Sequence, residues 1–217
     1  MALNINGTTG ISGVDGSVSA PAVTGTDSNT GITFPSADTI KFSTGGVERM
    51  SITNSGVTGA GGGKILQVVQ TVKTDTTSLN TIDTWTDISG MNVSITPSSS
   101  SNKILVTAVL NTGQLQGSYY GLRLEKGGTA IAVGDASGNR LQGYFGQGPR
   151  SHNSMLDNTT INFLDTAGGT SAITYNIAWY IAYTNGSTLY LNRYYSGADA
   201  DYNQRTISTI TAMEVAA

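Results

Sequence analysis

The 217-residue chain has no cysteine and a single histidine, His152. A disulfide framework, a thiolate metal site and a cluster of histidine ligands are therefore excluded. Charged residues make up only 12% of the sequence, against roughly 25% in an average domain. The net charge is −3 and the 11 basic residues are dispersed. We therefore expect no nucleic-acid or anionic-membrane partner, because both bind clustered positive charge. No apolar run approaches the roughly 18 residues of a membrane-spanning helix, so we also expect no membrane insertion.

The first 60 residues differ in composition from the rest of the chain. They are dominated by glycine, serine and threonine, and all ten tyrosines and both tryptophans follow residue 84. Their start, MALNINGTTG, has neither the basic residues nor the apolar stretch of a signal peptide. With so few large apolar groups, the segment is either a disordered tail or is ordered by other copies of the chain. Short β-like pieces at 39–42 and 48–53 are predicted to be strands joined by tight turns.

From Lys64 onward the hydrophobic pattern has the two-residue period of β-strands. The longest alternation covers 173–183, and residues 103–110 are apolar on nearly both faces, which predicts a central strand. No stretch has the pattern of a capped amphipathic helix. The sequence therefore predicts an all-β protein: an antiparallel β-sandwich or jelly roll over residues 61–217, after an extended or short-strand segment over residues 1–60. A glycine hinge is expected at 59–63. Further alternating stretches lie at 66–72, 91–95, 120–124, 189–193 and 207–213.

Four motifs occur in a fixed order in the N-terminal segment: TGISGVDGS at 9–17, GTDSNTGITF at 25–34, ADT at 37–39 and TGGVER at 44–49. This succession resembles the opening of structural proteins of aquatic bacteriophages, especially cyanophages, in which it leads into a variable C-terminal domain. The later part of the chain, with WTDI and SSSSNKIL, is similar to a sandwich domain common at the ends of such proteins. The resemblance implies a virion protein, a homotrimeric fibre or spike, that docks on other virion proteins through residues 1–60.

Elementary packing also favours self-association of residues 1–60. Frequent glycines permit close approach of backbones, and the few apolar side chains can be buried against symmetry mates. We therefore interpret this segment as one that anchors or trimerises the protein.

No residue pattern predicts catalysis. His152 has serine neighbours, but adjacent residues of an extended segment point to opposite faces, and no nucleophile elbow precedes them. Glycan hydrolysis needs two carboxylates that flank a sugar in a cleft, and we interpret the available acids as solvated loop residues. We expect a non-enzymatic protein with no cofactor and no metal. The available carboxylate pairs are Asp83 with Asp87, which flank Trp85, and Asp199 with Asp201.

Two predicted loops carry side chains suited to ligand recognition. One follows the strand near residue 190, and the other covers 140–153. Tyrosine beside arginine, asparagine and aspartate is typical of recognition surfaces. The alternative is that these aromatic side chains cap the core or fill an interface between copies. The candidate ligand-binding residues are Tyr190, Arg193, Tyr194, Tyr195 and Tyr202 in the first loop, and Tyr144 and Phe145 in the second.

The sequence thus favours a virion structural protein exposed on the tail or the capsid. The leading hypothesis is a trimeric tail fibre that binds a receptor, with host surface glycan as the ligand. The alternative is a capsid decoration or head-fibre protein docked on the shell through its N-terminal segment. A glycan-degrading spike is a third, minor hypothesis.

Overall fold

The computed structural model describes residues 4–6, 10–12, 15–59, 65–114, 117–148, 151–153, 155–182 and 188–217. The chain divides into two compact units, Met1–Gly62 and Gly63–Ala217. Within the described ranges every regular element is a β-strand, so no helix there is long and apolar enough to cross a membrane. The prediction of an all-β, antiparallel fold is confirmed. Most of the predicted hinge at 59–63 lies outside the described residues.

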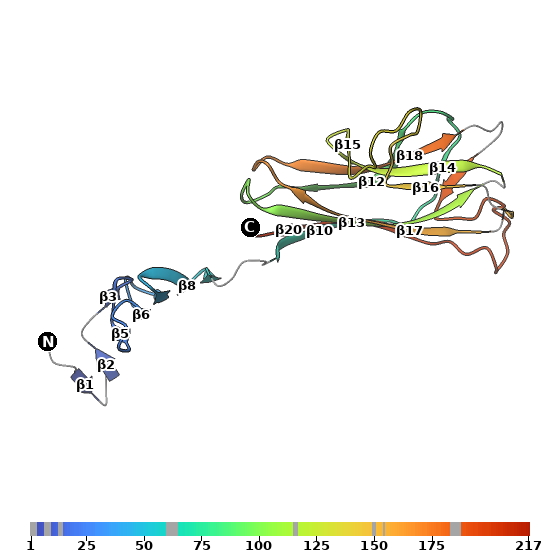
Figure 1. The fold of residues 1–217 in the computed structure, drawn as a ribbon. Coiled ribbons are helices and arrows are strands. Elements are labelled where there is room, and N and C mark those ends of the chain that lie inside the picture. The colour runs from blue at the N-terminus through green and yellow to red at the C-terminus, as the bar shows by residue number, and fades with distance from the viewer. Residues whose placement is uncertain are drawn as a thin grey trace. The chain divides into compact units, whose positions relative to one another are not determined.

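The C-terminal unit is a sandwich of two antiparallel sheets (Figure 1). Strands that follow one another along the chain mostly alternate between the two sheets, and the first long strand pairs with the last. This arrangement is a jelly roll. Sheet I consists of β10 (Ile65–Lys73), β20 (Ser208–Val215), β13 (Lys103–Gln114) and β17 (Asp157–Thr166), with the short strands β19 (Leu189–Leu191) and β11 (Thr77–Leu79). Sheet II consists of β12 (Thr86–Ile95), β18 (Ile173–Ala182), β14 (Tyr119–Lys126), β15 (Thr129–Ile131) and β16 (Phe145–Gln147).

The core lies between the two sheets and follows the predicted alternation. In β18, one face of the strand points inward and is buried, while Tyr183 lies outside the described residues. The strand predicted to be central, β13, is paired on both of its edges. The largest fully buried side chains are Trp179, Tyr175, Ile88, Met91, Ile104, Leu110, Leu122, Leu124, Ile161, Ile177, Ile181 and Leu189.

Strand β10 forms where the alternation predicts it, but Gln67 and Thr71 lie on its inner face and the predicted apolar row lies on its outer face. Val68 and Val72 are exposed, whereas Gln67 lies on the inner face opposite Glu214 of β20. Glu214 is completely buried, and the amide Nε2 of Gln67 donates to its carboxylate at 2.6 Å. A buried carboxylate needs such donors, which explains why a polar side chain occupies the inner face here.

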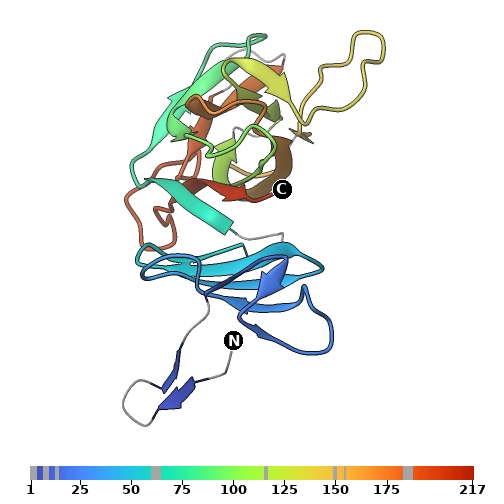
Figure 2. The ribbon, with the colours of Figure 1, turned by 90° about the vertical axis from the view of Figure 1, so that its left-hand side faces the viewer.

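The N-terminal unit contains no sandwich among its described residues. Figure 2 shows its longer strands side by side in one layer. This N-terminal sheet consists of β5 (Val23–Thr24), β6 (Gly31–Thr33), β7 (Ile40–Thr44), β8 (Val47–Thr53) and β9 (Gly56–Thr58), in that order. Two small hairpins precede it, β1 (Asn4–Asn6) with β2 (Gly10–Ser12) and β3 (Gly16–Ser17) with β4 (Ala20–Pro21).

Candidate ligand groove

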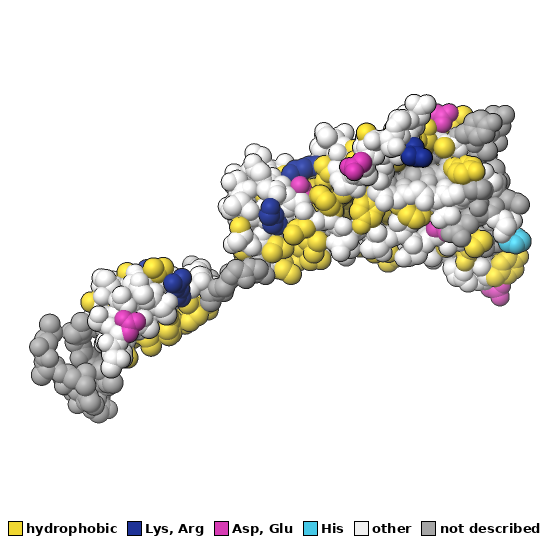
Figure 3. Space-filling view, in the orientation of Figure 1, with side chains coloured by type: hydrophobic (Ala, Val, Ile, Leu, Met, Phe, Trp, Pro, Cys, Tyr) yellow, Lys and Arg dark blue, Asp and Glu magenta, His cyan; other side chains and the backbone are white. Residues whose placement is uncertain are grey.

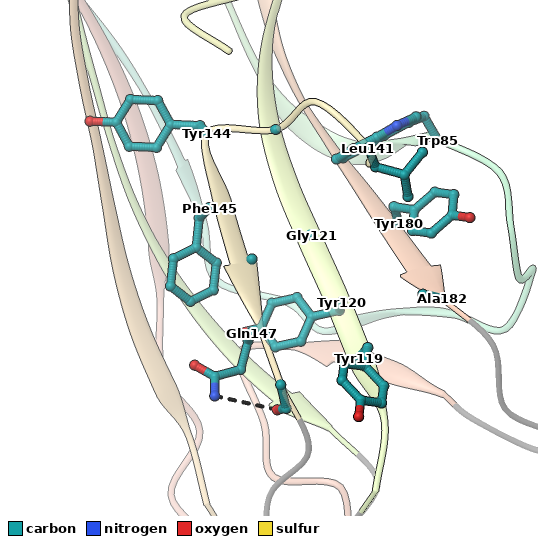
Figure 4. A pocket seen from close by; sticks show the side chains of 13 residues that line it. Trp85, Tyr119, Tyr120, Gly121, Leu141, Tyr144, Phe145, Gln147, Tyr180 and Ala182 are labelled. Carbon is teal, nitrogen blue, oxygen red and sulfur yellow. Dashed lines mark hydrogen bonds between the residues drawn. The ribbon is translucent and has the colours of Figure 1, made fainter. Parts of the chain in front are cut away.

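A groove of about 470 Å³ opens on the outer face of sheet II. Its aromatic walls are Trp85, which precedes β12, Tyr119 of β14 and Tyr180 of β18. Leu141 reaches it from the connection between β15 and β16 (Figure 4). Several glycines also line it, and Gly121 is one of them. The groove is therefore a surface hollow with aromatic walls and exposed backbone.

The glycines make room for the indole of Trp85. A Cβ atom on Gly121 would lie 3.2 Å from Cη2 of Trp85, and one on Gly143 would lie 3.4 Å from the same atom. Both distances are short for carbon contacts, so a side chain at either position would push the indole aside. The ring also packs against Tyr180, with centroids 5.3 Å apart, and beneath the guanidinium of Arg123, whose Cζ lies 4.4 Å from its centroid. These contacts hold Trp85 in one orientation.

The charged groups beside the groove are occupied by partners within the protein. The hydroxyl of Tyr180 donates to Oδ1 of Asp83 at 2.9 Å. Burial and this hydrogen bond raise the pKa of Tyr180, so its phenol is neutral. Nε of Arg123 donates to Oε1 of Glu125 at 2.7 Å. The residues that line the groove are all uncharged, so the site suits a neutral ligand with an apolar face and some hydroxyl groups.

Both residues predicted in the loop at 140–153, Tyr144 and Phe145, line the groove, but each ring is also held by contacts elsewhere in the jelly roll. The loop contains the short strand β16, so the expectation of a continuous loop was wrong. Phe145 packs toward the core, with its ring 5.8 Å from that of Tyr120. Figure 4 shows Tyr144 pointing away from Trp85. Its hydroxyl donates to the backbone oxygen of Asn162 and accepts from the backbone nitrogen of Asn162, at 3.2 and 3.0 Å. Tyr144 thus ties sheet II to β17 of sheet I.

The other predicted loop follows β19 and packs on Gly113 of sheet I. The backbone nitrogen of Ser196 donates to the backbone oxygen of Asn153 at 3.4 Å, so the two loops touch, but no tyrosine of this loop lines the groove. The structure brings Tyr190, Arg193 and Tyr195 together: Cζ of Arg193 lies 4.2 Å from the Tyr190 centroid, and the two tyrosine rings are 5.7 Å apart. The guanidinium also donates to the backbone oxygens of residues 194 and 195. Tyr194 donates its hydroxyl to Gln204, and Tyr202 is 68% exposed. The side chain of Arg193 therefore stabilises its own loop.

The candidate catalytic residues have structural contacts or lie in solvent. Asp83 binds Tyr180 as described, and Asp87 accepts from Nδ2 of Asn176 at 2.9 Å. His152, Asp199 and Asp201 are exposed. Among the described residues no three acidic or histidine side chains are grouped so that they could hold a metal ion.

The ligand-binding residues predicted from the sequence do not include Trp85, Tyr119 or Tyr180, although Trp85 lies between two of the candidate acids. One signal could have pointed to Tyr180. It is the only aromatic residue on the otherwise small and polar face of the long strand at 173–182. An aromatic side chain on that face must be covered by another segment or remain exposed.

No family model matches this chain, and no curated protein sequence matches it. Among solved structures it is similar to that of the Gx strain of infectious bursal disease virus, at 12% identity and a TM-score of 0.38, over 94% of this chain and 54% of that one. The structure of the Gt strain matches at 10% identity and a TM-score of 0.39, over 94% and 56% of the two chains. A mutant VP2 protein of the same virus matches at 10% identity and a TM-score of 0.38, over 94% of this chain and 54% of that one. The chain thus spans about half the length of these proteins, and at such scores function is argued from the site alone.

Proposed function

We propose that the protein is a bacteriophage virion structural protein that acts as a receptor-binding appendage, of the tail-fibre type. In this proposal the jelly roll is the distal head that meets the host surface, and the N-terminal unit attaches the protein to the virion. The order of motifs in residues 9–49 supports a virion protein, and the groove on sheet II supports a role in recognition.

The groove at Trp85, Tyr119 and Tyr180 is the observation that carries the proposal. A stable domain gains nothing from leaving aromatic rings beside a glycine-lined hollow, since filling the hollow would bury more apolar surface. Here Gly121 and Gly143 leave room for the indole of Trp85, while Asp83 fixes Tyr180 and Arg123 fixes Trp85. Such preorganisation is what a binding site requires.

Host surface glycan is the ligand class that fits this groove. A sugar ring has one face rich in C–H groups, which packs on an aromatic ring, and a rim of hydroxyl groups that bind backbone and amide groups. Gln147 and backbone groups of the lining glycines can provide the latter contacts. The uncharged lining favours a neutral glycan over an acidic one.

The test is competition for adsorption. Purified protein added to host cells should reduce the adsorption of phage particles in a dose-dependent way. The Tyr119→Ala variant should lose most of this competition, because the ring is 48% exposed and forms a wall of the groove. Trp85→Ala should lose it as well. The matched control is Tyr202→Ala, which removes an exposed tyrosine from the connection between β19 and β20, away from the groove lining, and should compete as well as the unmodified protein.

The outcome also separates the two virion roles. If the unmodified protein does not compete, and antibodies against it label the head of the particle and not the tail, the receptor-binding proposal is wrong and capsid decoration takes its place. If the protein competes but Tyr119→Ala and Trp85→Ala compete equally well, the groove is not the site of recognition.

A further inference from the structure

Gly146 lies in the middle of β16 and forms part of the floor of the groove. The register pairs it with Gly121 of β14, and Gly121 in turn pairs with Tyr180 of β18. Residues paired in this way point to the same face of a sheet, so the three residues form one row across the outer face of sheet II. Two of the three positions in that row have no side chain.

The fold explains the first of these glycines but not the second. A Cβ atom on Gly121 would meet the indole of Trp85, as described above. A Cβ atom on Gly146 would meet nothing within 4 Å in the described part of the chain, and the φ of Gly146 lies outside the positive range that favours glycine. Neither packing nor backbone conformation therefore requires glycine at residue 146.

Glycine inside a strand has few physical reasons. It destabilises the strand relative to residues with a side chain, and it marks a bulge, a tight bend, or a place where a ligand or another backbone approaches closely. Strand β16 pairs with consecutive residues of β14 without a register shift, so neither a bulge nor a sharp bend lies at Gly146. The empty space over it excludes an approaching backbone from the described residues. The reason that remains is a ligand.

The aromatic rings of the groove lie at two separate places along β14. Trp85 lies over Gly121 and packs on Tyr180. Tyr119 is two residues away from Gly121 on the same strand, and therefore on the same face, where it is 48% exposed. Two residues of a strand span about 6.8 Å, and Figure 4 shows Tyr119 further along β14, away from Trp85. A sugar ring that packs face to face on one of these places leaves the other for the next ring of a chain.

The size and charge of the groove fit an uncharged chain of linked sugars. Its volume of about 470 Å³ falls within the roughly 300–1,000 Å³ of sites that hold drug-sized ligands. No lining residue is charged. Beside the groove, Arg123 is paired with Glu125, and the carboxylate of Asp83 accepts from Tyr180. On the face seen in Figure 3, few charged side chains interrupt the neutral surface of the jelly roll.

We infer that the groove binds an extended chain of at least two linked neutral sugars, and that Gly146 is the position that admits the second ring. One ring packs on Tyr119, and its neighbour lies over the backbone of Gly146 beside the indole of Trp85. Gly146 thus determines the length of ligand that the groove accepts. This arrangement rests on the proposed function, because it takes a glycan as the ligand.

The first test fills the space over Gly146. Leucine at this position enters empty space on an extended strand, so Gly146→Leu should melt at the same temperature as the unmodified protein. The matched control is Gly169→Leu, because Gly169 also has nothing described within 4 Å and an ordinary φ, but does not line the groove. Gly146→Leu should lose about tenfold or more in its competition for phage adsorption, the scale on which a change of pocket shape acts. Gly169→Leu should compete like the unmodified protein.

A second measurement tests the length of the ligand. The probes are the neutral sugars of acid-hydrolysed host envelope, separated by size into single sugars, pairs and longer chains, and binding is followed by tryptophan fluorescence. Pairs and longer chains should bind the unmodified protein roughly tenfold more tightly than single sugars, because the second ring binds intramolecularly once the first is in place. Gly146→Leu should keep the weak binding of single sugars and lose the advantage of the longer pools.

Gly146→Ala covers the case in which the leucine variant does not fold. Its one methyl group enters the same space, so it should weaken the binding of pairs and longer chains and leave that of single sugars unchanged. A folded Gly146→Ala variant that binds the longer pools as tightly as the unmodified protein contradicts a second ring at this position.

The remaining outcomes separate this arrangement from the proposed function. If Tyr119→Ala and Trp85→Ala lose competition but Gly146→Leu competes fully, the groove recognises the host and the second ring at Gly146 is wrong. If single sugars bind as tightly as the longer pools, the groove takes a terminal sugar and the extended chain is wrong. If the unmodified protein neither competes nor binds any pool, the proposed function fails, and the extended chain fails with it.

Discussion

The two units of this protein contain the same kind of alternating strand but bury it differently. In the jelly roll the apolar faces of two sheets pack on each other, and rows of side chains such as Leu122 are completely buried. In the N-terminal sheet an equally regular set of rows faces solvent, and threonine and serine occupy the buried side. Alternation therefore fixes which residues share a face, but only the number of layers decides whether that face is buried within one chain.

The largest difference between the units should appear in core variants. Leu122→Ala removes a fully buried side chain from the centre of the jelly roll and should lower its free energy of unfolding by about 2–5 kcal/mol. The loss should not depend on protein concentration, because both sheets belong to one chain. Chemical denaturation followed by tryptophan fluorescence measures it, since both tryptophans lie in this unit.

Phe42→Ala is the matched variant in the N-terminal sheet. If copies of the chain associate through this sheet, as the sequence predicts, the effect should be large only in dilute solution, where the copies separate, and small at high concentration. A jelly roll whose midpoint of unfolding depends on concentration as steeply as that of the N-terminal sheet would remove the distinction between the units.

The sequence predicted the fold class because the hydrophobic pattern within each long strand of the jelly roll agrees with the burial of that strand. The stretch 173–182 alternates without error, and residues 103–110 are apolar on both faces because β13 is central. Strand β10 shows where a local pattern fails to predict which face of a strand is buried. Val68 and Val72 face outward, although Val69 packs against the core, because the buried carboxylate of Glu214, far along the chain, needs the amide of Gln67 on the inner face. No local pattern contains that requirement.

A buried asparagine should be the next most sensitive position, because it closes one end of the jelly roll with hydrogen bonds. Asn192 is 0% exposed, has a φ of 63°, and donates through Nδ2 to the backbone oxygens of Lys73 and Asp75 at 2.9 Å each. Its Oδ1 accepts from the hydroxyl of Ser208 at 2.6 Å. Asn192→Ala leaves these groups unpaired and strains the backbone, so thermal unfolding should show a loss of about 3 kcal/mol.

Asn192→Gly separates the two causes of that loss. Glycine adopts the positive φ freely, so this variant removes only the hydrogen bonds and should retain most of the destabilisation. A glycine variant as stable as the unmodified protein would show that the backbone conformation alone matters at this position.

The candidate site was harder to predict than the fold, again because its parts come from distant segments. Trp85, Tyr119 and Tyr180 belong to three different parts of the chain, and the indole of Trp85 fits at the groove because Gly121 and Gly143 lack side chains. By contrast, the tyrosines of residues 190–202 are neighbours in sequence, so their cluster can be recognised from the sequence alone. Their arginine packs on Tyr190 and binds its own loop.

A smaller loss of stability, seen only at acidic pH, is expected from Glu214 at the other end of the jelly roll. Burial alone would raise the pKa of Glu214, but hydrogen bonds from Asn102, Gln67 and Ser98 outweigh burial and lower the pKa to about 2 from the ordinary value of 4.5. The folded state therefore binds this proton more weakly than the unfolded state. The stabilisation is complete above about pH 4.5 and is lost as the pH falls toward 2.

Unfolding measured between pH 6 and pH 2 tests this expectation against Glu214→Gln. The glutamine variant should be less stable at pH 6, because an amide replaces the charge-assisted bonds, and should lose less stability on acidification. If both proteins lose stability in parallel between pH 4.5 and pH 2, Glu214 is not the group responsible.

The smallest effect should come from the loop over sheet I, and it separates exposed from packed tyrosines. Tyr202 is 68% exposed, so Tyr202→Ala should change the free energy of unfolding by less than about 0.5 kcal/mol. Tyr195 packs edge-on against Tyr190, with centroids 5.7 Å apart, so Tyr195→Ala should cost about 1 kcal/mol. Neither variant should affect competition for adsorption, because the groove lies on the other sheet. If Tyr195→Ala keeps its stability but loses adsorption, this loop and not the groove on sheet II is the surface that meets the host.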